Sequence, residues 1–202
     1  MSKMILKETS TIYKGHSKLE LAQMLQQYDD GQEVLLSREV LKARDSVVVL
    51  LYRQDTKQLV FTSQWRAPIV FCGDQRPVIE ACAGNIDQED FDSHPQDVLA
   101  AANIAVIREV QEETGWHIAK LDYLYALYSC PGISTEKLYY YIACVDKRIQ
   151  QGGGLRSEGE DIFVLEMSLS EAIEKIKNEE IIDLKTVALI QYLQIHKAVY
   201  LE

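Results

Sequence analysis

The stretch REVQEETGW, residues 108–116, places three glutamates on the last two turns of an expected helix. Glu109 and Glu113 are four residues apart and therefore share one helix face, and Glu112 lies beside them. Like charges at this spacing repel, at a cost of about a few tenths of a kcal/mol per pair. Either Arg108 and solvent screen an ordinary acidic surface, or a divalent cation compensates the charge, since Mg²⁺ prefers oxygen ligands.

The helix that carries these glutamates is the clearest element of the sequence, and it is predicted over residues 95–114. Ser93 is its expected N-cap, with Pro95 in the first turn, because both residue types are common at helix starts. Gly115 is the expected C-terminal stop, since glycine readily adopts the left-handed conformation that ends helices. Apolar residues at helical spacing, between Val98 and Val110, form the side that would face a core.

Short apolar and β-branched runs predict strands on both sides of this helix. SVVVLLYR (46–53) and LVFTSQW (59–65) are expected to form a hairpin. Three more strands are expected at LDYLYALYS (121–129), KLYYYIACV (137–145) and IFVLEM (162–167). Two further helices are expected at 168–180 and 184–197. Segment 19–31 fits a helix by its apolar spacing, but its Asp-Asp-Gly end and the following run 33–43 favour two strands. This mixed order indicates an α/β or α+β sandwich with a mixed sheet.

Composition and charge narrow the class of protein. The 202 residues are 47% hydrophobic, which suits one large domain or a domain with an N-terminal extension. With 21 basic against 31 acidic residues and no basic block, nucleic-acid binding is not expected. No signal peptide is evident, no run approaches the ~18 apolar residues of a membrane span, and the four cysteines form no CxxC pair. We therefore expect a cytoplasmic protein without a membrane partner.

Beyond these general features, REVQEETGW resembles the second half of the Nudix box, in which Arg-Glu is followed by an aliphatic residue, Glu-Glu, glycine and a large apolar residue. Upstream, EACAGNID (80–87) is similar to the strand and loop that open this box. Together with SQWRAP (63–68), PGISTE (131–136) and GGGLRSEGEDI (152–162), the similarity is to the Nudix branch that hydrolyses ADP-ribose and other nucleoside diphosphate sugars. It covers most of the chain, from about Glu33 to Leu193.

This resemblance implies a Nudix α/β/α sandwich with a mixed sheet in residues 44–202, preceded by a small β-rich part in residues 1–43. In this branch, the N-terminal part typically builds a homodimer. The implied reaction is hydrolysis of the pyrophosphate bond of a nucleoside diphosphate sugar with Mg²⁺, or alternatively Mn²⁺, as the cofactor. The phosphates repel a nucleophile, so the reaction needs cations on the phosphates and a carboxylate that prepares water.

The resemblance also implies roles for individual residues. The metal ligands would be Glu109, Glu113, the backbone carbonyl of Ala83, and Glu160 from the loop SEGED, with Glu112 assisting directly or through water. Arg108 would orient the glutamates. Glu158 would be the base that deprotonates the attacking water, although Glu112 is close enough to compete for this role. Taken without the resemblance, a charge run in a glycine-rich loop is more often a solvated turn.

The sequence departs from the family's box in two places. Gly84 precedes Arg108 by 24 positions, about ten more than usual, so extra residues around QEDFDSHPQD lie between them. Ala100 stands where the box has a glutamate that helps to hold the loop and the helix together, and Asp97 or Asp92 could replace it. The extra segment is polar with one aromatic residue, so a solvated surface loop is expected. The alternative is an element that faces the substrate or a dimer partner.

Contacts with the substrate are implied for three residues. Arg66 would clamp a phosphate or ribose, Glu80 would accept a hydrogen bond from a base or sugar, and Glu136 would touch the terminal sugar side. The simpler interpretations are a surface ion pair for Arg66 and a structural acid for Glu80. Trp65 could stack on a base or pack in the core.

ADP-ribose, cleaved to AMP and ribose 5-phosphate, is the first substrate that we expect. GDP-mannose or a UDP-sugar is the alternative, because EACAGNID and GGGLRSEGED also resemble members that act on UDP-sugars and no base-selecting residue is evident. A catalytically weak protein that binds a nucleotide sugar and regulates a partner is a hypothesis from another class. The retained glutamates argue against it.

Overall fold

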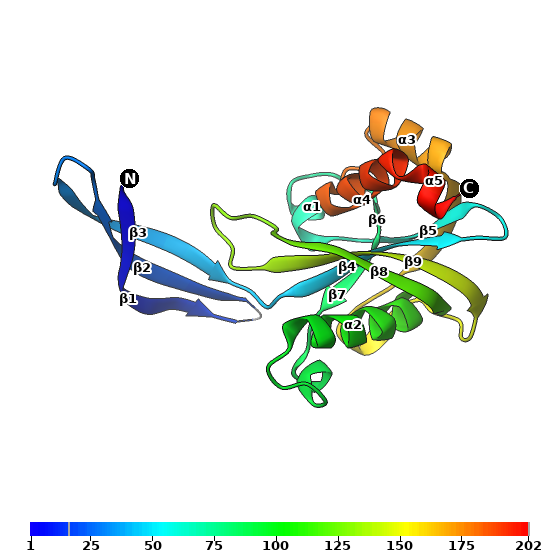
Figure 1. Ribbon diagram of the computed structural model, residues 1–202, viewed down its shortest axis with the longest axis horizontal. Coiled ribbons are helices and arrows are strands. Elements are labelled where there is room, and N and C mark those ends of the chain that lie inside the picture. The colour runs from blue at the N-terminus through cyan, green and yellow to red at the C-terminus, as the bar shows by residue number, and fades with distance from the viewer. Residues whose placement is uncertain (16, 202) are drawn as a thin grey trace. The chain divides into compact units, whose positions relative to one another are not determined.

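The computed structural model describes the chain except for His16, Glu202 and the side chain of Glu158. The chain forms two compact units (Figure 1). Unit 1 comprises Met1–Asp45 and Tyr128–Lys137, and unit 2 comprises Ser46–Leu127 and Leu138–Glu202. Within the described part of the chain, no helix has the length and apolar character needed to cross a membrane.

Unit 1 is built on an antiparallel sheet with the strand order β1-β2-β3. These strands are β1 (Lys3–Lys14), β2 (Lys18–Gln27) and β3 (Glu33–Lys42). The turn between β2 and β3 ends in Gly31, whose φ of +88° is typical of glycine in a tight turn. The strand interpretation of this segment is therefore confirmed. Residues 128–137 join the unit through Leu41, whose N–H donates to the carbonyl of Ile133 at 2.8 Å.

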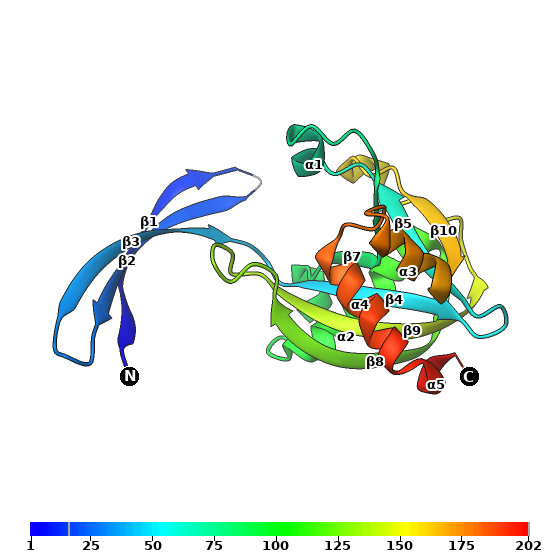
Figure 2. The same ribbon diagram turned by 90° about the horizontal axis from the view of Figure 1, so that it is seen from above.

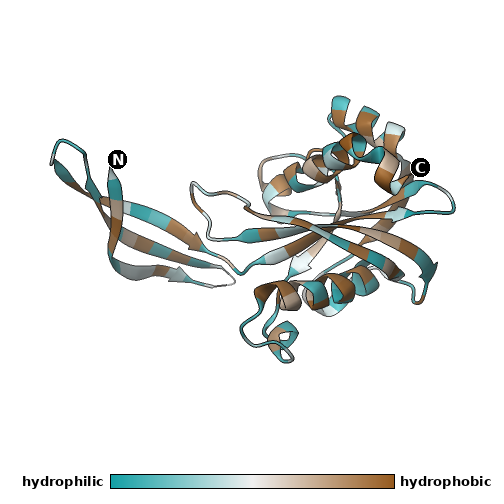
Figure 3. Cartoon of the chain, in the orientation of Figure 1, coloured by the Kyte–Doolittle hydropathy of each residue, from teal (hydrophilic) through white to brown (hydrophobic). Residues whose placement is uncertain are grey.

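Unit 1 has almost no core of its own. Ala22 is the one buried apolar residue among its described residues, whereas Leu6 and Leu35 are 55% and 63% exposed. Paired residues of neighbouring strands share a face, so the rows Ile5-Leu25-Leu35 and Leu6-Met24-Leu36 put apolar side chains on opposite faces. The strands accordingly carry hydrophobic and hydrophilic residues in mixture (Figure 3).

A seven-stranded mixed sheet, with the main order β10-β5-β4-β9-β8, forms the centre of unit 2. Its strands are β4 (Ser46–Arg53), β5 (Gln58–Gln64), β6 (Val78–Glu80), β7 (Cys82–Asn85), β8 (Trp116–Tyr128), β9 (Lys137–Arg148) and β10 (Phe163–Ser168). The helices are α1 (Ala67–Phe71), α2 (Val98–Glu109), α3 (Leu169–Lys177), α4 (Leu184–Ile195) and α5 (Lys197–Tyr200), with short helical turns η1 (Gln88–Phe91), η2 (Val110–Thr114) and η3 (Arg156–Glu158). Strand β4 pairs parallel with β9 and antiparallel with β5 and β7.

The central strand β4 is buried on both faces, which explains its continuous apolar sequence. Val47 and Val49 pack in the core layer that includes α2, whereas Val48 and Leu50 pack in the layer that includes α3 and α4. Figure 1 shows α2 below the sheet and α3 and α4 above it, and Figure 2 shows α4 running across the strands. The predicted α/β/α sandwich with a mixed sheet is therefore confirmed.

The start of α2 corrects the sequence prediction. Its N-cap is Asp97, whose side chain accepts hydrogen bonds from two N–H groups of the first turn, whereas Ser93 lies outside the helix. Residues 88–91 instead form the separate turn η1. The other end agrees with the prediction, since Gly115 adopts φ +72° after a last turn of π-helix.

Candidate active site

The end of α2 and the turn η2 carry the three glutamates of the REVQEETGW stretch. The helix changes from α to π geometry at Val110, and such π turns are frequent at functional sites. Glu109 and Glu113 are only 9% and 2% exposed, whereas Glu112 is half-buried. A buried carboxylate loses its hydration, so it needs hydrogen-bond donors or a cation close by.

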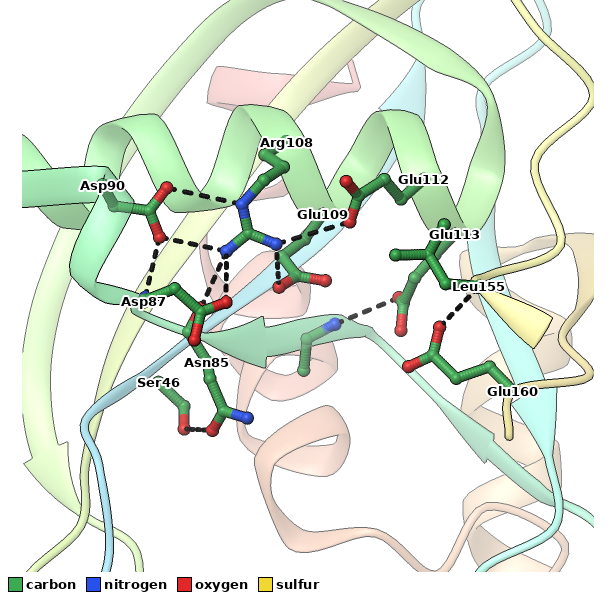
Figure 4. A network of polar contacts seen from close by, with 11 residues as sticks. Ser46, Asn85, Asp87, Asp90, Arg108, Glu109, Glu112, Glu113, Leu155 and Glu160 are labelled. Atoms are coloured by element: carbon green, nitrogen blue, oxygen red, sulfur yellow. Dashed lines mark hydrogen bonds and ion pairs between the residues drawn. The ribbon is translucent and has the colours of Figure 1, made fainter. Parts of the chain in front are cut away.

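Arg108 supplies part of that compensation. Its guanidinium donates to Glu109 Oε1 at 2.8 Å, to Glu112 Oε2 at 3.3 Å and to the carbonyl of Asn85 at 3.0 Å (Figure 4). On its other side it contacts the carboxylate of Asp90 at 3.0 and 3.4 Å. Burial alone would lower the pKa of Arg108, but the surrounding carboxylates outweigh burial and raise this pKa above its usual value. Arg108 therefore links the helix to the segment that follows β7.

The two buried glutamates remain difficult to ionise. Burial raises the pKa of Glu109 to about 7 and the pKa of Glu113 to about 8. The charge of Arg108 opposes the shift of Glu109, whereas the negative charge of Glu160 adds to the shifts of both. Figure 4 shows the carboxylates of Glu113 and Glu160 turned toward each other, with Glu109 on the same side of the helix. The site therefore concentrates more negative charge than its own arginine balances.

Strand β7 packs against these buried carboxylates. The N–H of Ala83 donates to Glu113 Oε2 at 3.3 Å, and the buried thiol of Cys82 acts against the rise in the pKa of this carboxylate. Gly84 lies so close to Glu109 that a Cβ there would be 1.9 Å from the carboxyl carbon. Glycine is therefore required at this position by the close approach of a side chain.

The glycine-rich loop after β9 docks on the end of the helix. The N–H groups of Gly153 and Gly154 donate to the carbonyls of Glu113 and Glu112 at 2.8 and 3.0 Å. Carbonyls at a helix end have no partner within the helix, so the loop caps them. Farther along the loop, the carboxylate of Glu160 accepts a backbone N–H of the same loop at 2.8 Å. These bonds bring the loop glutamate to the helix glutamates.

Glu109, Glu113 and Glu160, which the resemblance implies as metal ligands, lie near one another at the end of the helix. Within the described residues, no group of three or more histidine, cysteine, aspartate or glutamate side chains is arranged to hold a metal ion. The donor set nevertheless fits a hard divalent cation, which prefers carboxylate and carbonyl oxygens. The raised pKa values of Glu109 and Glu113 fit it too, because a cation would favour their charged forms. The side chain of Glu158 lies outside the described residues, so its role as the base stays a prediction.

A second polar cluster joins Arg66, Glu80 and Lys185. Glu80 is 4% exposed, and its two oxygens bind Arg66 at 2.7 Å and Lys185 at 2.9 Å. A buried carboxylate between two cations is well compensated. Arg66 is therefore an ion-pair partner, and Glu80 is the buried structural acid with which it pairs. Both simpler interpretations of the sequence are thus met by one contact. Substrate binding by either residue stays a prediction, and sequence analysis missed Lys185.

The remaining substrate candidates are Glu136 and Trp65. Glu136 belongs to unit 1, where its N–H donates to Ser134 Oγ at 3.1 Å and its carbonyl accepts from the N–H of Ser129 at 3.1 Å. Its contact with the substrate stays a prediction. Trp65 is 53% exposed, so the alternative that it packs in the core is wrong.

The segment before α2 binds Arg108 through Asp90, which contacts two of its nitrogens, and through Asp87 at 3.4 Å. Sequence analysis selected neither residue for the place of the missing box glutamate. Asp97 caps α2 instead, and no contact of Asp92 with Arg108 is found among the described residues. The extra segment is also not simply a solvated loop, because Asp90 is 2% exposed and Phe91 packs against the core. One signal in the sequence could have indicated this role. The extra segment is rich in acidic residues, and it lies beside a box in which Ala100 replaces the usual glutamate.

None of the known protein-family models matches the chain. Among curated relatives, a GDP-mannose pyrophosphatase of Cronobacter sakazakii is 37% identical over 169 residues, which is 82% of each chain. A GDP-mannose pyrophosphatase of Escherichia coli K12 is 35% identical over 168 residues, or 82% of this chain and 81% of the relative. The chain therefore belongs to the Nudix hydrolase family.

A solved structure shares the fold. The crystal structure of an ADP compounds hydrolase matches with a TM-score of 0.67 and covers 96% of each chain. Its sequence is 16% identical, so the match shows the architecture alone.

Proposed function

We propose that the chain hydrolyses the pyrophosphate bond of a nucleoside diphosphate sugar with Mg²⁺, or alternatively Mn²⁺, and that GDP-mannose is its main substrate. The observation that carries the reaction type is the gathering of Glu109, Glu113 and Glu160 at the end of α2, where burial and mutual repulsion call for a cation. The choice of GDP-mannose over ADP-ribose reverses the order expected from the sequence. It is supported by relatives of that name at 35–37% identity over four-fifths of the chain.

In this reaction water attacks one phosphorus atom, and the bond from that phosphorus to the bridging oxygen breaks. GDP-mannose and water would give GMP and mannose 1-phosphate, and ADP-ribose would give AMP and ribose 5-phosphate. The proposed metal ligands are Glu109, Glu112, Glu113, Glu160 and the carbonyl of Ala83. The bound cations would neutralise the phosphates and so lower the barrier to attack by an anionic nucleophile.

The other residues would prepare water and hold the substrate. Glu158, on the loop, would take the proton from water, with Glu112 as the alternative base. Arg66 remains 39% exposed while it binds Glu80, so it keeps donors to offer to a phosphate. Lys185, bound to the other oxygen of Glu80, would keep that carboxylate in place to accept from a base or sugar.

The substrate panel that tests this proposal contains GDP-mannose, ADP-ribose and UDP-glucose, each with Mg²⁺, Mn²⁺ or EDTA. A phosphatase added after quenching releases phosphate from the monoester products but not from intact substrate. We expect turnover with the metal ions and none with EDTA, and at least a tenfold higher kcat/KM for GDP-mannose. Faster hydrolysis of ADP-ribose than of GDP-mannose would show that ADP-ribose, the first substrate expected from the sequence, is the main one. A rise in melting temperature with no turnover would instead favour the regulatory binding protein.

We also propose that the N-terminal part, residues 1–43, joins two copies of the chain into a homodimer. Its apolar rows on both faces, with Leu6 and Leu35 more than half exposed, call for a covering surface. A second copy suits this surface because unit 1 carries eight basic and eight acidic residues, whereas the whole chain has a net charge of −10. Contact through the neutral unit would avoid most repulsion between two acidic chains.

A further inference from the structure

We infer that Asp90 is a positioning residue for catalysis: the extra segment of the box supplies it in place of the missing glutamate, and it holds Arg108 so that Arg108 can present Glu109 and Glu112. This inference rests on the proposed function. It concerns a residue that lies 18 positions before the arginine, in the part of the chain where the box departs from the family pattern.

The contacts of Asp90 form a closed arrangement on one side of the guanidinium. Arg108 Nε approaches Asp90 Oδ1 at 3.4 Å, and NH2 approaches Oδ2 at 3.0 Å, so the carboxylate meets two edges of the planar fork. Oδ2 also accepts the N–H of Asp87 at 2.8 Å, and the Asp87 side chain bonds the backbone of Asp90 in return. This reciprocal capping box fixes Asp90 on η1. Figure 4 shows the bond between Asp87 and the carboxylate of Asp90.

The division of donors on Arg108 explains why Asp90 matters to the glutamates. Asp90 engages Nε and NH2, and NH1 is left to donate to Glu109 at 2.8 Å and to Glu112 at 3.3 Å. A guanidinium presents its donors in one rigid plane, so a partner on one edge sets the direction of the other edge. Without Asp90, Nε would lose its carboxylate partner, and NH2 would keep the carbonyl of Asn85 at 3.0 Å and the carboxylate of Asp87 at 3.4 Å, so the plane of the fork would be held less firmly.

Burial makes this contact more than a surface ion pair. The Asp90 side chain is 3% exposed and the Arg108 side chain 30% exposed, so solvent screens the pair weakly on the aspartate side. Neighbouring Glu89 on the same turn is exposed, which makes it a matched acidic control. Ala100, two helical turns before Arg108, is the site from which a family-type glutamate would approach the arginine.

The experiment compares Asp90→Asn, Glu89→Gln and the double variant Asp90→Asn/Ala100→Glu with the unmodified chain. For each, kcat, the KM for GDP-mannose and the Mg²⁺ concentration at half-maximal rate are measured. We expect Asp90→Asn to raise the half-maximal Mg²⁺ concentration by about 10- to 100-fold, the usual effect of losing a group that orients metal ligands. We expect the KM to change little and Glu89→Gln to behave as the unmodified chain. The double variant should recover at least part of the Mg²⁺ response.

Two results would overturn the inference. One is an unchanged Mg²⁺ response and kcat in a folded Asp90→Asn variant. The other is a lower melting temperature as the sole effect of that substitution, which would mean a structural role. If Asp90→Asn does not fold, Asp90→Glu takes its place: its longer side chain moves the carboxylate away from the two edges of the fork, so the half-maximal Mg²⁺ concentration should rise, and an unchanged Mg²⁺ response and kcat would contradict the inference.

The increase in melting temperature on adding Mg²⁺ is measured on the same proteins without substrate. If the unmodified chain cleaves nothing in the panel, the proposed function fails. The inference about Asp90 is then still decided by whether Asp90→Asn needs more Mg²⁺ for the same rise in melting temperature.

Discussion

At the scale of single residues, the main property of the site is that burial disfavours the charged form of its carboxylates. Glu109 and Glu113 have pKa values of about 7 and 8, above the value of 4.5 for an unperturbed glutamate. Each therefore binds a proton in the folded chain at pH values where the unfolded chain has released it. This contribution to stability is fully present below about pH 4.5 and is lost as the pH rises through 7 and 8.

The metal-free protein should accordingly become less stable between pH 5 and pH 8.5. A change of about 1 kcal/mol corresponds to about 2–4 °C in a protein of this size, and we expect a fall of at least that amount. Added Mg²⁺ should raise the melting temperature more at pH 8.5 than at pH 5, because it binds the charged carboxylates. Differential scanning fluorimetry across this pH range, with EDTA or Mg²⁺, measures both effects.

Glu113→Gln should flatten this pH dependence and remove most of the turnover, since it deletes one charge from the cluster. Glu39→Gln, at an exposed glutamate of β3, is the matched control and should leave both properties unchanged. If Glu113→Gln kept near-normal turnover at saturating Mg²⁺, the end of α2 would not be the metal site.

The sequence was informative about these residues only where a local pattern carried the information. The REVQEETGW stretch is contiguous, so the shared face of Glu109 and Glu113 followed from helical spacing. Asp90 meets Arg108 across a loop whose path depends on tertiary contacts, and its neighbours Asp92 and Asp97 are chemically equivalent candidates. Spacing alone could not choose among the four acids of segment 88–97.

At the scale of elements, most long periodic segments of unit 2 were predictable and its short ones were not. The strands β4 and β5, the continuous helix formed by α2 and η2, and the helices α3 and α4 lie within about three residues of their predicted bounds. The short elements α1, β6 and β7 contain too few residues to show a period. The start of α2 was misplaced because Ser93 and Asp97 are both good capping residues, and the placement of η1 decides between them.

The docking of the glycine-rich loop on η2 gives an element-scale prediction. Gly152 has φ +73°, and a Cβ there would lie 2.5 Å from the backbone carbon of Thr114. We expect Gly152→Ala to push the loop away from the helix end and to lower kcat by at least about tenfold, because this loop carries Glu160. Steady-state kinetics over a range of Mg²⁺ concentrations, with circular dichroism to verify folding, measures the effect.

Gly31→Ala separates backbone strain from loop displacement. Gly31 has φ +88° in the β2–β3 turn, and a Cβ there would meet no atom within 4 Å, so the substitution reports strain without a clash. This control should lose about 1 kcal/mol of stability and keep its kcat. Equal kinetic losses in both variants would mean that the docking of the loop does not matter to catalysis.

At the scale of the whole molecule, the two units differ in how much of the folded state they can support alone. Unit 2 has apolar layers on both faces of its sheet, as expected for an independently stable sandwich. Unit 1 has three strands and one buried apolar residue among those described, which is too little core for stability in water. The strand pair β2 and β3 could be predicted from its turn residues, whereas β1 was not predicted as a strand. What covers the sheet could not be predicted, because a covering surface leaves no pattern in one sequence.

The proposed homodimer should therefore depend on the apolar rows of unit 1. Light scattering after size exclusion should give a mass of twice 23.1 kDa for the unmodified chain and 23.1 kDa for Leu6→Glu/Leu35→Glu, which places one charge on each face. Ser10→Glu adds the same charge to an exposed position of β1 without removing an apolar group and should remain dimeric.

Because the apolar contact acts against a net charge of −10 per chain, salt should tighten the dimer by screening the remaining repulsion. A monomer at micromolar concentration in 0.5 M salt, with the unmodified sequence, would contradict the proposal.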